Sequence, residues 1–117
     1  MNNDSSNKNT GKDCPIKLVQ KIISGKWKIL ILWYLTEEPR RFGELNRLLP
    51  NTSRGVLTEQ LKQLEQDGLV HRQVYDEMPL KVVYSLTDIG EGFCSVLTAM
   101  GEWAHIYMDK KHSLNNQ

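Results

Sequence analysis

The segment from Ser53 to Gly68, SRGVLTEQLKQLEQDG, carries side chains that could recognise DNA. Ser53 can cap a helix N-terminus, Gly68 can end a helix, and Leu57, Leu61 and Leu64 recur at the spacing of one apolar stripe. The opposite face of the predicted helix is polar: Gly55, Thr58, Glu59, Lys62 and Gln63, with Arg54 in the first turn. Arg, Lys, Gln and Thr side chains recognise base edges in the major groove of DNA. An ordinary solvated face has a similar composition, so the neighbouring segments must distinguish the two interpretations.

The side chains that could carry nucleophilic or metal chemistry are few and scattered. They are two cysteines and three histidines: Cys14, Cys94, His71, His105 and His112. They lack the clustered spacing of a zinc site, and the sequence has no glycine-rich phosphate loop and no paired acid and base. We therefore predict a protein that is not an enzyme, with no catalytic residues, no metal and no cofactor. In a reducing compartment both cysteines should remain thiols.

The length and composition indicate one compact domain. The chain has 117 residues, 39% of them hydrophobic, and its longest apolar run, residues 29–35, is much shorter than the roughly 20 residues of a membrane-spanning helix. The N-terminus is polar and has no apolar segment of a secretion signal, so we expect a cytoplasmic protein without a membrane partner. The net charge is only +1, but residues 1–54 hold 10 Lys or Arg against 5 Asp or Glu, which is compatible with a basic face.

Both ends of the sequence are polar and of low complexity. They predict disordered tails at residues 1–13 and 111–117, on either side of one folded domain at residues 14–110.

The first half of this domain has the order of a helix-turn-helix. Pro15 is well placed to begin a short helix, and the apolar residues 26–36 predict a buried central helix. Residues 40–42 predict one edge strand, and residues 43–49 predict a brief helix that Pro50 ends. A tight connection then leads to the helix with the polar face, which is the arrangement typical of a helix-turn-helix.

After Gly68 the periodicity changes from helical to alternating. Residues 69–75 and 81–86 predict two strands of a β-hairpin, with Pro79 in the turn. Thr87 then offers an N-cap for a last helix. The predicted fold class is mainly α with a small β-hairpin (α+β), as in a winged helix-turn-helix.

The last helix has a broader apolar stripe than a core of this size needs. We expect part of the stripe to pack against a second copy of the chain, although all of it could instead fold back on its own chain. The side chains expected at this dimer interface are Ile16, Phe93, Val96, Leu97, Met100, Trp103 and Tyr107.

Several motifs occur in one order along the chain: Cys14-Pro15, Gly25-Lys26-Trp27, Arg40-Arg41-Phe42 with Leu45, Leu64-Glu65 with Asp67-Gly68-Leu69-Val70, and Tyr84-Ser85-Leu86-Thr87 with Gly90. Together they resemble the HxlR family of winged-helix transcriptional regulators, which is related to the MarR group. The resemblance implies a homodimer joined through its N- and C-terminal helices, with recognition helices in successive major grooves and wings at the flanking backbone. We therefore predict a sequence-specific regulator that binds double-stranded DNA.

The resemblance also implies a role for Cys14, because some members of the family look like sensors that use the matching cysteine. Lys12, Lys17 and the predicted helix N-terminus all favour a Cys14 thiolate, whereas Asp13 opposes it. Such a thiolate could be alkylated by a small electrophile. Alternatively, it could be oxidised to a sulfenic acid and then form a disulfide with Cys94 of the other subunit. Alternatively, Cys14 only packs at the dimer interface and Cys94 acts as a small hydrophobic residue.

We expect two groups of DNA-contacting residues. Base edges should be contacted by Arg54, Thr58, Lys62 and Gln63, and phosphates by Ser53, Arg40, Arg41, Arg72 and Lys81. Acidic residues at the wing tip make a strong minor-groove contact unexpected. The main alternative is a winged helix that binds only proteins, and a further alternative is a small-molecule site near Trp27 and Trp103.

Overall fold

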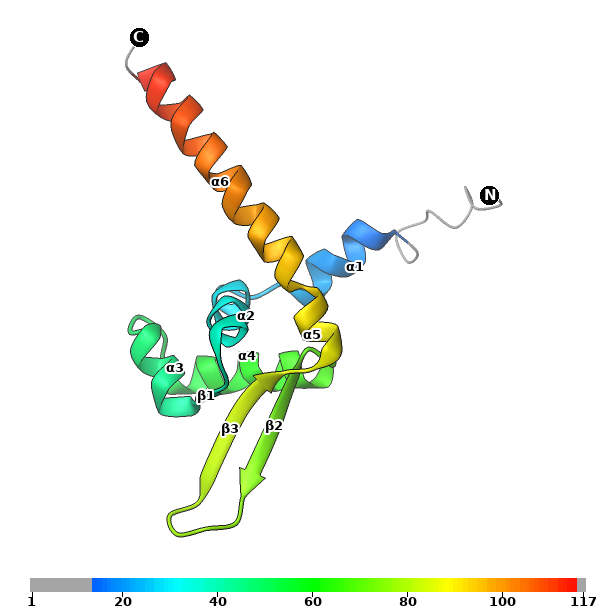
Figure 1. Ribbon diagram of the computed structural model, residues 1–117, viewed down its shortest axis with the longest axis vertical. Coiled ribbons are helices and arrows are strands. Elements are labelled where there is room, and N and C mark those ends of the chain that lie inside the picture. Colours follow the sequence, from blue (N-terminus) through cyan, green and yellow to red (C-terminus); the bar gives the residue numbers. More distant parts are fainter. Residues whose placement is uncertain (1–13, 116–117) are drawn as a thin grey trace, which may run out of the picture.

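The computed structural model describes residues 14–115; the predicted disordered tail at residues 1–13 lies outside the described part, as do residues 116–117. Within it, helices and a small sheet alternate along the chain (Figure 1). The elements are α1 (Pro15–Ile22), α2 (Lys28–Glu37), β1 (Arg40–Arg41), α3 (Phe42–Leu48), α4 (Arg54–Gln66), β2 (Val70–Tyr75), β3 (Lys81–Leu86), α5 (Asp88–Gly92) and α6 (Cys94–Asn115).

Helix α2 lies at the centre of the domain, which confirms the predicted central helix. Its side chains Ile31, Leu32 and Leu35 are buried, and the helix contacts α4, α6 and β3. The buried leucines of α4, Leu57, Leu61 and Leu64, belong to the same core. Burying each such side chain contributes about 1.5–3 kcal/mol, so this core fixes which face of α4 points away from the protein.

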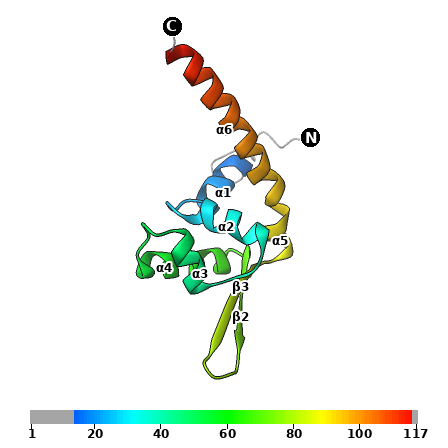
Figure 2. The same cartoon turned by 60° about the vertical axis from the view of Figure 1, so that its left-hand side comes forward.

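The sheet confirms both the predicted edge strand and the predicted hairpin. Its three antiparallel strands have the order β1-β3-β2. Arg40 of β1 pairs with Tyr84 of β3, and β2 pairs with β3 from Val70 opposite Leu86 to Tyr75 opposite Lys81. Figures 1 and 2 show the hairpin extending from one end of the body and α6 from the other.

The chain segments that enter and leave the hairpin pack closely against each other. We call this region the wing base, and it consists of Gly68, Leu69, Thr87 and Gly90. Thr87 N–H donates to the Leu69 carbonyl at 3.0 Å, and Gly90 N–H donates to Thr87 Oγ1 at 3.1 Å. Gly68 has φ +84°, which an L side chain rarely adopts. A Cβ atom at Gly90 would lie 2.2 Å from the Leu69 carbonyl oxygen. The wing base therefore joins the end of α4, both hairpin strands and the start of α5.

The C-terminal part differs from the prediction of one continuous helix. A short helix, α5, is separated from α6 by Phe93, whose N–H donates to the Gly90 carbonyl at 3.0 Å. The wing base holds α5 against Leu69, and α6 begins directly after Phe93.

The boundary predicted at residue 111 is also wrong, because α6 is helical as far as Asn115. The sequence contains two reasons that the prediction missed. Lys110 and Lys111 place positive charge near the C-terminus of the helix, where it interacts favourably with the helix dipole. Leu114 continues the apolar stripe of the helix by another turn.

The packing at the wing base predicts that two alanine substitutions in α5 change the free energy of unfolding differently. Gly90→Ala should lower the free energy of unfolding by about 1–3 kcal/mol, because its new methyl group collides with backbone that cannot move away easily. Gly92→Ala should leave it unchanged or raise it by up to about 1 kcal/mol, because a Cβ there meets nothing within 4 Å. Urea denaturation at one fixed protein concentration measures both. Equal effects of the two substitutions would contradict this account of Gly90.

Candidate nucleic-acid interface

Helices α3 and α4 are joined by a short turn that the side chains around it hold in place. Asn46 Nδ2 in α3 donates to the Thr52 carbonyl at 3.2 Å, and Thr52 N–H donates to the Leu49 carbonyl at 3.1 Å. Ser53 is the N-cap of α4, and its Oγ accepts a hydrogen bond from Val56 N–H at 3.1 Å. Helix α4 therefore begins in a fixed orientation relative to α3, as a helix-turn-helix requires.

Helix α4 is buried on one face and exposed on the other. Leu57, Leu61 and Leu64 face the core, whereas most of the predicted polar face is exposed. Gln60 points inward, and its Oε1 accepts a hydrogen bond from Trp27 N–H at 2.9 Å. Within residues 14–115, Thr58, Glu59 and Lys62 of this face are exposed, so the face is open to a binding partner.

The residues predicted to contact base edges all lie on α4. Thr58 and Lys62 are exposed, and Gln63 Nε2 donates to Glu59 Oε2 at 3.1 Å. Arg54 Cζ lies 4.6 Å from the centre of the Phe42 ring, so a cation–π contact holds this exposed side chain beside α3.

Arg40 is a correction to the predicted phosphate contacts. Its guanidinium donates to the Tyr34 carbonyl at 3.2 Å and forms ion pairs with Glu37 and Glu38, and its side chain is only 13% exposed. These interactions tie the end of α2 to β1, so Arg40 has a structural role. Arg41, the next residue, is exposed and remains a candidate.

The two cations predicted on the wing lie on opposite faces of the hairpin. In the strand register, Arg72 pairs with Tyr84, which faces the core, whereas Lys81 pairs with Tyr75 on the other face. Lys81 Nζ lies 5.2 Å from the centre of the Tyr75 ring. Arg72 and Lys81 therefore do not form one basic surface.

Arg47 is an exposed cation that the sequence analysis did not select. It lies in the last turn of α3, and its Nη1 would be 3.7 Å from a Cβ atom at Gly43. Leu45 and Leu49 are buried and each lies two residues from Arg47, about 200° around the helix, and this spacing is the sequence signal that could have identified Arg47 as exposed.

Cys14 is the N-cap of α1 and is partly exposed. The backbone N–H groups of Lys17 and Ile16 lower the pKa of the Cys14 thiol below its ordinary value, partial burial opposes this, and the charge of Lys17 lowers it slightly further. The helix N-terminus is therefore the main cause, and the neighbouring cation is a minor one. Lys12 and Asp13 lie outside the described residues.

The far end of α1 is connected to α4. Lys28 is buried with 3% exposure, and its Nζ donates to the Ile22 carbonyl at 3.4 Å. The next residue back, Trp27, donates its N–H to Gln60 of α4. Lys28 therefore links the end of α1 to the start of α2, and the neighbouring Trp27 links the start of α2 to the candidate recognition helix.

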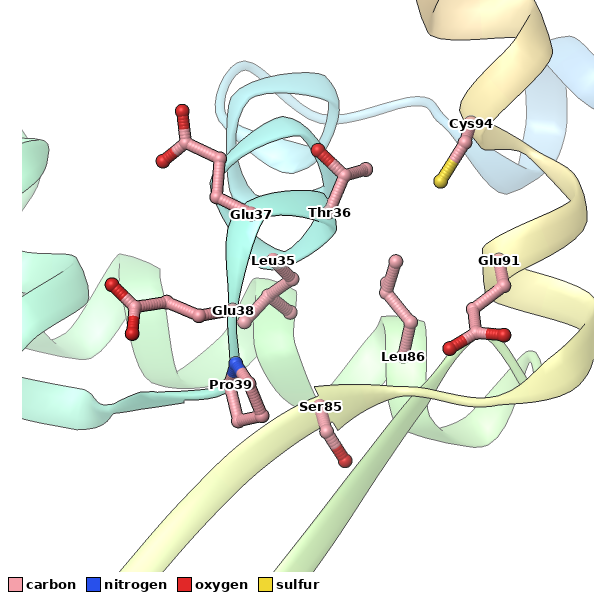
Figure 3. A pocket seen from close by; sticks show the side chains of 9 residues that line it. All are labelled: Leu35, Thr36, Glu37, Glu38, Pro39, Ser85, Leu86, Glu91 and Cys94. Atoms are coloured by element: carbon pink, nitrogen blue, oxygen red, sulfur yellow. The ribbon is translucent and has the colours of Figure 1, made fainter.

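Cys94 does not belong to the apolar stripe of α6. Its thiol points into an open cavity of about 400 Å³ between the end of α2, strand β3 and helix α5 (Figure 3). The carboxylates of Glu37, Glu38 and Glu91 come from residues that line the same cavity. The interpretation of Cys94 as a small hydrophobic residue among apolar neighbours is therefore incomplete.

The predicted dimer residues fall into two groups. Ile16, Val96, Met100, Trp103 and Tyr107 are all substantially exposed in the single chain. Leu97 is a correction, because it is 5% exposed and belongs to the core of its own chain. Phe93 also packs against this core. The difference follows from helix geometry, because Leu97 faces α2 while its neighbour Val96 points about 100° away.

Two further findings concern the described residues alone. No group of three or more His, Cys, Asp or Glu side chains among residues 14–115 could hold a metal ion. Over the same range, no helix has the length and apolar character needed to cross a bilayer.

The two tryptophans of the alternative small-molecule site lie in different surroundings. Trp27 packs against the core at the start of α2, whereas Trp103 lies on the projecting α6 and stacks on Tyr107.

A helix-turn-helix followed directly by a β-hairpin wing defines the class of winged helix-turn-helix proteins. The sequence matches the HxlR-like helix-turn-helix family over residues 22–112, and the chain belongs to that family. It is therefore a helix-turn-helix transcriptional regulator, as predicted.

Individual relatives agree with this assignment. The chain is 41% identical over 97 residues to YdeP, an HTH-type transcriptional regulator of Bacillus subtilis (strain 168), in an alignment covering 83% of this chain and 76% of YdeP. The structure of the redox regulator HypR in its reduced form is similar with a TM-score of 0.80 and 37% identity, covering 85% of this chain and 98% of HypR. The reduced form of the transcriptional regulator YodB from B. subtilis has a TM-score of 0.70 and 38% identity, covering 78% and 90% of the two chains.

The lowered pKa of Cys14 predicts a pH profile for its alkylation. In Cys94→Ser, which leaves Cys14 as the one remaining thiol of the sequence, the rate of reaction with iodoacetamide should rise with pH through a midpoint below the value of about 8.5 for a free cysteine. Thiolate therefore persists to lower pH than in an ordinary cysteine. Mass spectrometry after timed quenching measures the rate at each pH. A midpoint at or above that of free cysteine would contradict the role of the α1 N-terminus.

Proposed function

We propose that this regulator binds a specific double-stranded DNA operator as a homodimer, with the polar face of α4 in the major groove. The observation that carries the proposal is the division of α4 into a face fixed in the core and a polar face that is largely exposed in the described part of the chain. The roles predicted from the sequence then follow. Arg54, Thr58, Lys62 and Gln63 approach base edges, while Ser53, Arg41, Arg72 and Lys81 contact phosphates.

The second copy of the chain is proposed to pack on α6 and α1. Val96, Met100, Trp103 and Tyr107 alternate at spacings of four and three residues, as side chains do along the seam of two paired helices. An exposed apolar cavity of about 490 Å³ lies along Val96, Met100 and Trp103. Ile16 of α1 adds another exposed apolar side chain. Large exposed apolar patches of this kind are typical of interfaces between proteins.

Cys14 is proposed to be the switch of the regulator. Its thiolate adds to an electron-poor carbon–carbon double bond to form a thioether, while the π bond opens and the neighbouring carbon takes a proton from water. Alternatively, the thiolate attacks a peroxide and breaks the O–O bond, which gives a sulfenic acid and reduces the remaining oxygen to water. Either product adds bulk and changes polarity at the start of α1, whose other end is connected through Lys28 and Trp27 to α4. In the predicted bridge, the Cys94 thiol of the second copy attacks the Cys14 sulfenic acid of the first copy, which gives a disulfide and releases water. This bridge requires α1 of the first copy to approach the cavity that Cys94 of the second copy faces.

The DNA-binding proposal predicts that two substitutions, one of an arginine and one of a lysine, change DNA affinity in different ways. Arg54→Ala should weaken operator binding by about 1–3 kcal/mol and relax specificity at one base pair of each half-site, because a base contact is lost. Lys81→Ala should weaken binding to all sequences about equally and lower the slope of log affinity against log salt by about one, because a phosphate contact is lost. Fluorescence anisotropy with operator and random duplexes at several salt concentrations measures both.

The same titration tests the alternatives. An equal loss on every sequence for Arg54→Ala would reject its role at a base edge. If the wild-type chain shows no salt-dependent DNA affinity at all, the polar face of α4 serves a protein partner instead. Repeating the titration after peroxide treatment tests the switch, since any change in affinity should disappear in Cys14→Ser.

The dimer proposal predicts that one charge on the α6 stripe separates the two chains. Trp103→Glu should give particles with the mass of one chain, because a carboxylate would be buried without a partner at the proposed interface. His105→Glu is the matched control, because His105 is exposed and lies about 200° around the helix from Trp103. Sedimentation equilibrium of both variants and of the wild type measures the masses. Two-chain particles of Trp103→Glu would place the interface elsewhere.

A further inference from the structure

A carboxylate lies in the middle of the polar face of α4, where DNA binding would bring it close to phosphates. Glu59 is exposed and lies opposite the leucines that face the core. Gln63 donates to it at 3.1 Å, while Lys62 forms no ion pair with it within the described part of the chain. Duplex DNA carries one negative charge per about 1.7 Å of its length. A carboxylate here therefore opposes binding unless a group on the DNA satisfies it.

Only some bases present such a group in the major groove. Cytosine N4 and adenine N6 carry amino groups that donate hydrogen bonds, whereas guanine N7 and O6 and thymine O4 only accept them. A carboxylate accepts but cannot donate. It gains a hydrogen bond from cytosine or adenine, and it faces electrostatic repulsion and an unsatisfied acceptor at guanine or thymine.

The hydrogen bond between Glu59 and Gln63 makes this preference stronger. Because the carboxylate can only accept, the amide of Gln63 must turn its nitrogen toward Glu59. The two side chains are thereby held together with Glu59 Oε1 and Gln63 Oε1 still available as acceptors. A restrained pair loses less conformational entropy on binding than two independent side chains.

Gly55 provides the space that this contact requires. It lies one helical turn before Glu59 on the same face, and a Cβ atom there would meet nothing within 4 Å. The backbone of the first turn of α4 can therefore come close to the groove floor. At that depth the Glu59 side chain reaches base edges instead of remaining at the level of the phosphates.

We propose that Glu59, oriented by Gln63, is a specificity-determining residue that selects a base with an amino group in the major groove at one base pair of each half-site. This inference rests on the proposed binding of α4 in the major groove. Glu59 contributes little to attraction, and its effect is to exclude guanine and thymine at that position. Specificity then arises partly from repulsion of wrong sequences.

The test begins with selection of binding sites from a random duplex library by the full-length wild-type protein and by Glu59→Gln. Anisotropy titrations of each protein follow, on the selected site and on its single-base variants. The wild type should prefer cytosine or adenine at one position of each half-site by roughly 5- to 150-fold over guanine or thymine. The titrations show which of the two amino bases is bound.

Glu59→Gln should reduce this preference to within about threefold and increase affinity for random duplexes, because the amide can donate to guanine or thymine and carries no charge. Glu65→Gln is the matched control. It removes the same charge from another exposed position of α4, at the side of the helix, and should leave every base preference unchanged. Circular dichroism verifies that both variants remain folded.

Two negative results have different meanings. If the wild type selects an operator and Glu59→Gln selects the same bases with the same ratios, the assignment of Glu59 is wrong and the proposed function stands. If the wild type selects no sequence at all, the proposed function is wrong, and the role of Glu59 is rejected with it.

Discussion

The close approach of the Gly90 backbone to the Leu69 carbonyl is the constraint on which the relative placement of the other elements depends. It lets Thr87 bond to both Gly68 and Leu69, so α4, the wing and α5 meet in one small region. Helix α5 then leads into α6 after Phe93, and α6 packs on α2 through the buried Leu97. The position of the candidate recognition helix relative to the proposed dimer helix thus depends on these backbone contacts together with the packing of both helices against α2.

Much of this fold could be predicted from local sequence patterns. The leucine spacing in α4, the capping Ser53 and the change to alternating periodicity after Gly68 each correspond to an element of the structure. The break between α5 and α6 at Phe93 could not be predicted in this way. It accompanies the contact between Gly90 and Leu69, which the whole hairpin separates in the sequence. The helical end of α6 was missed because its polar composition was taken as evidence of disorder.

The candidate site was less predictable than the fold, because charge alone does not show what a side chain contacts. Arg40 and Arg41 are adjacent and chemically identical, yet among the described residues the carboxylates at the end of α2 pair with Arg40 and not with Arg41. Glu37 and Glu38 are close to Arg40 in the sequence, but the course of the chain between α2 and β1 decides which of the two arginines they meet. Arg72 and Lys81 are both on the hairpin, but strand alternation places them on opposite faces. Glu59 was placed on the polar face but not among the predicted base contacts, because a carboxylate is not attracted to the phosphates of DNA.

Helix α6 has 22 residues, but Leu97 is its one buried residue within the described chain. The portion beyond Leu97 therefore gains little stability from its own chain, and isolated helices of this length are only marginally stable in water. In a dimer of the proposed kind, ordering of this portion and pairing of two chains become one equilibrium that depends on protein concentration. Operator occupancy would then rise more steeply than in proportion to the number of chains in the cell, so the regulator would respond to its own abundance as a threshold.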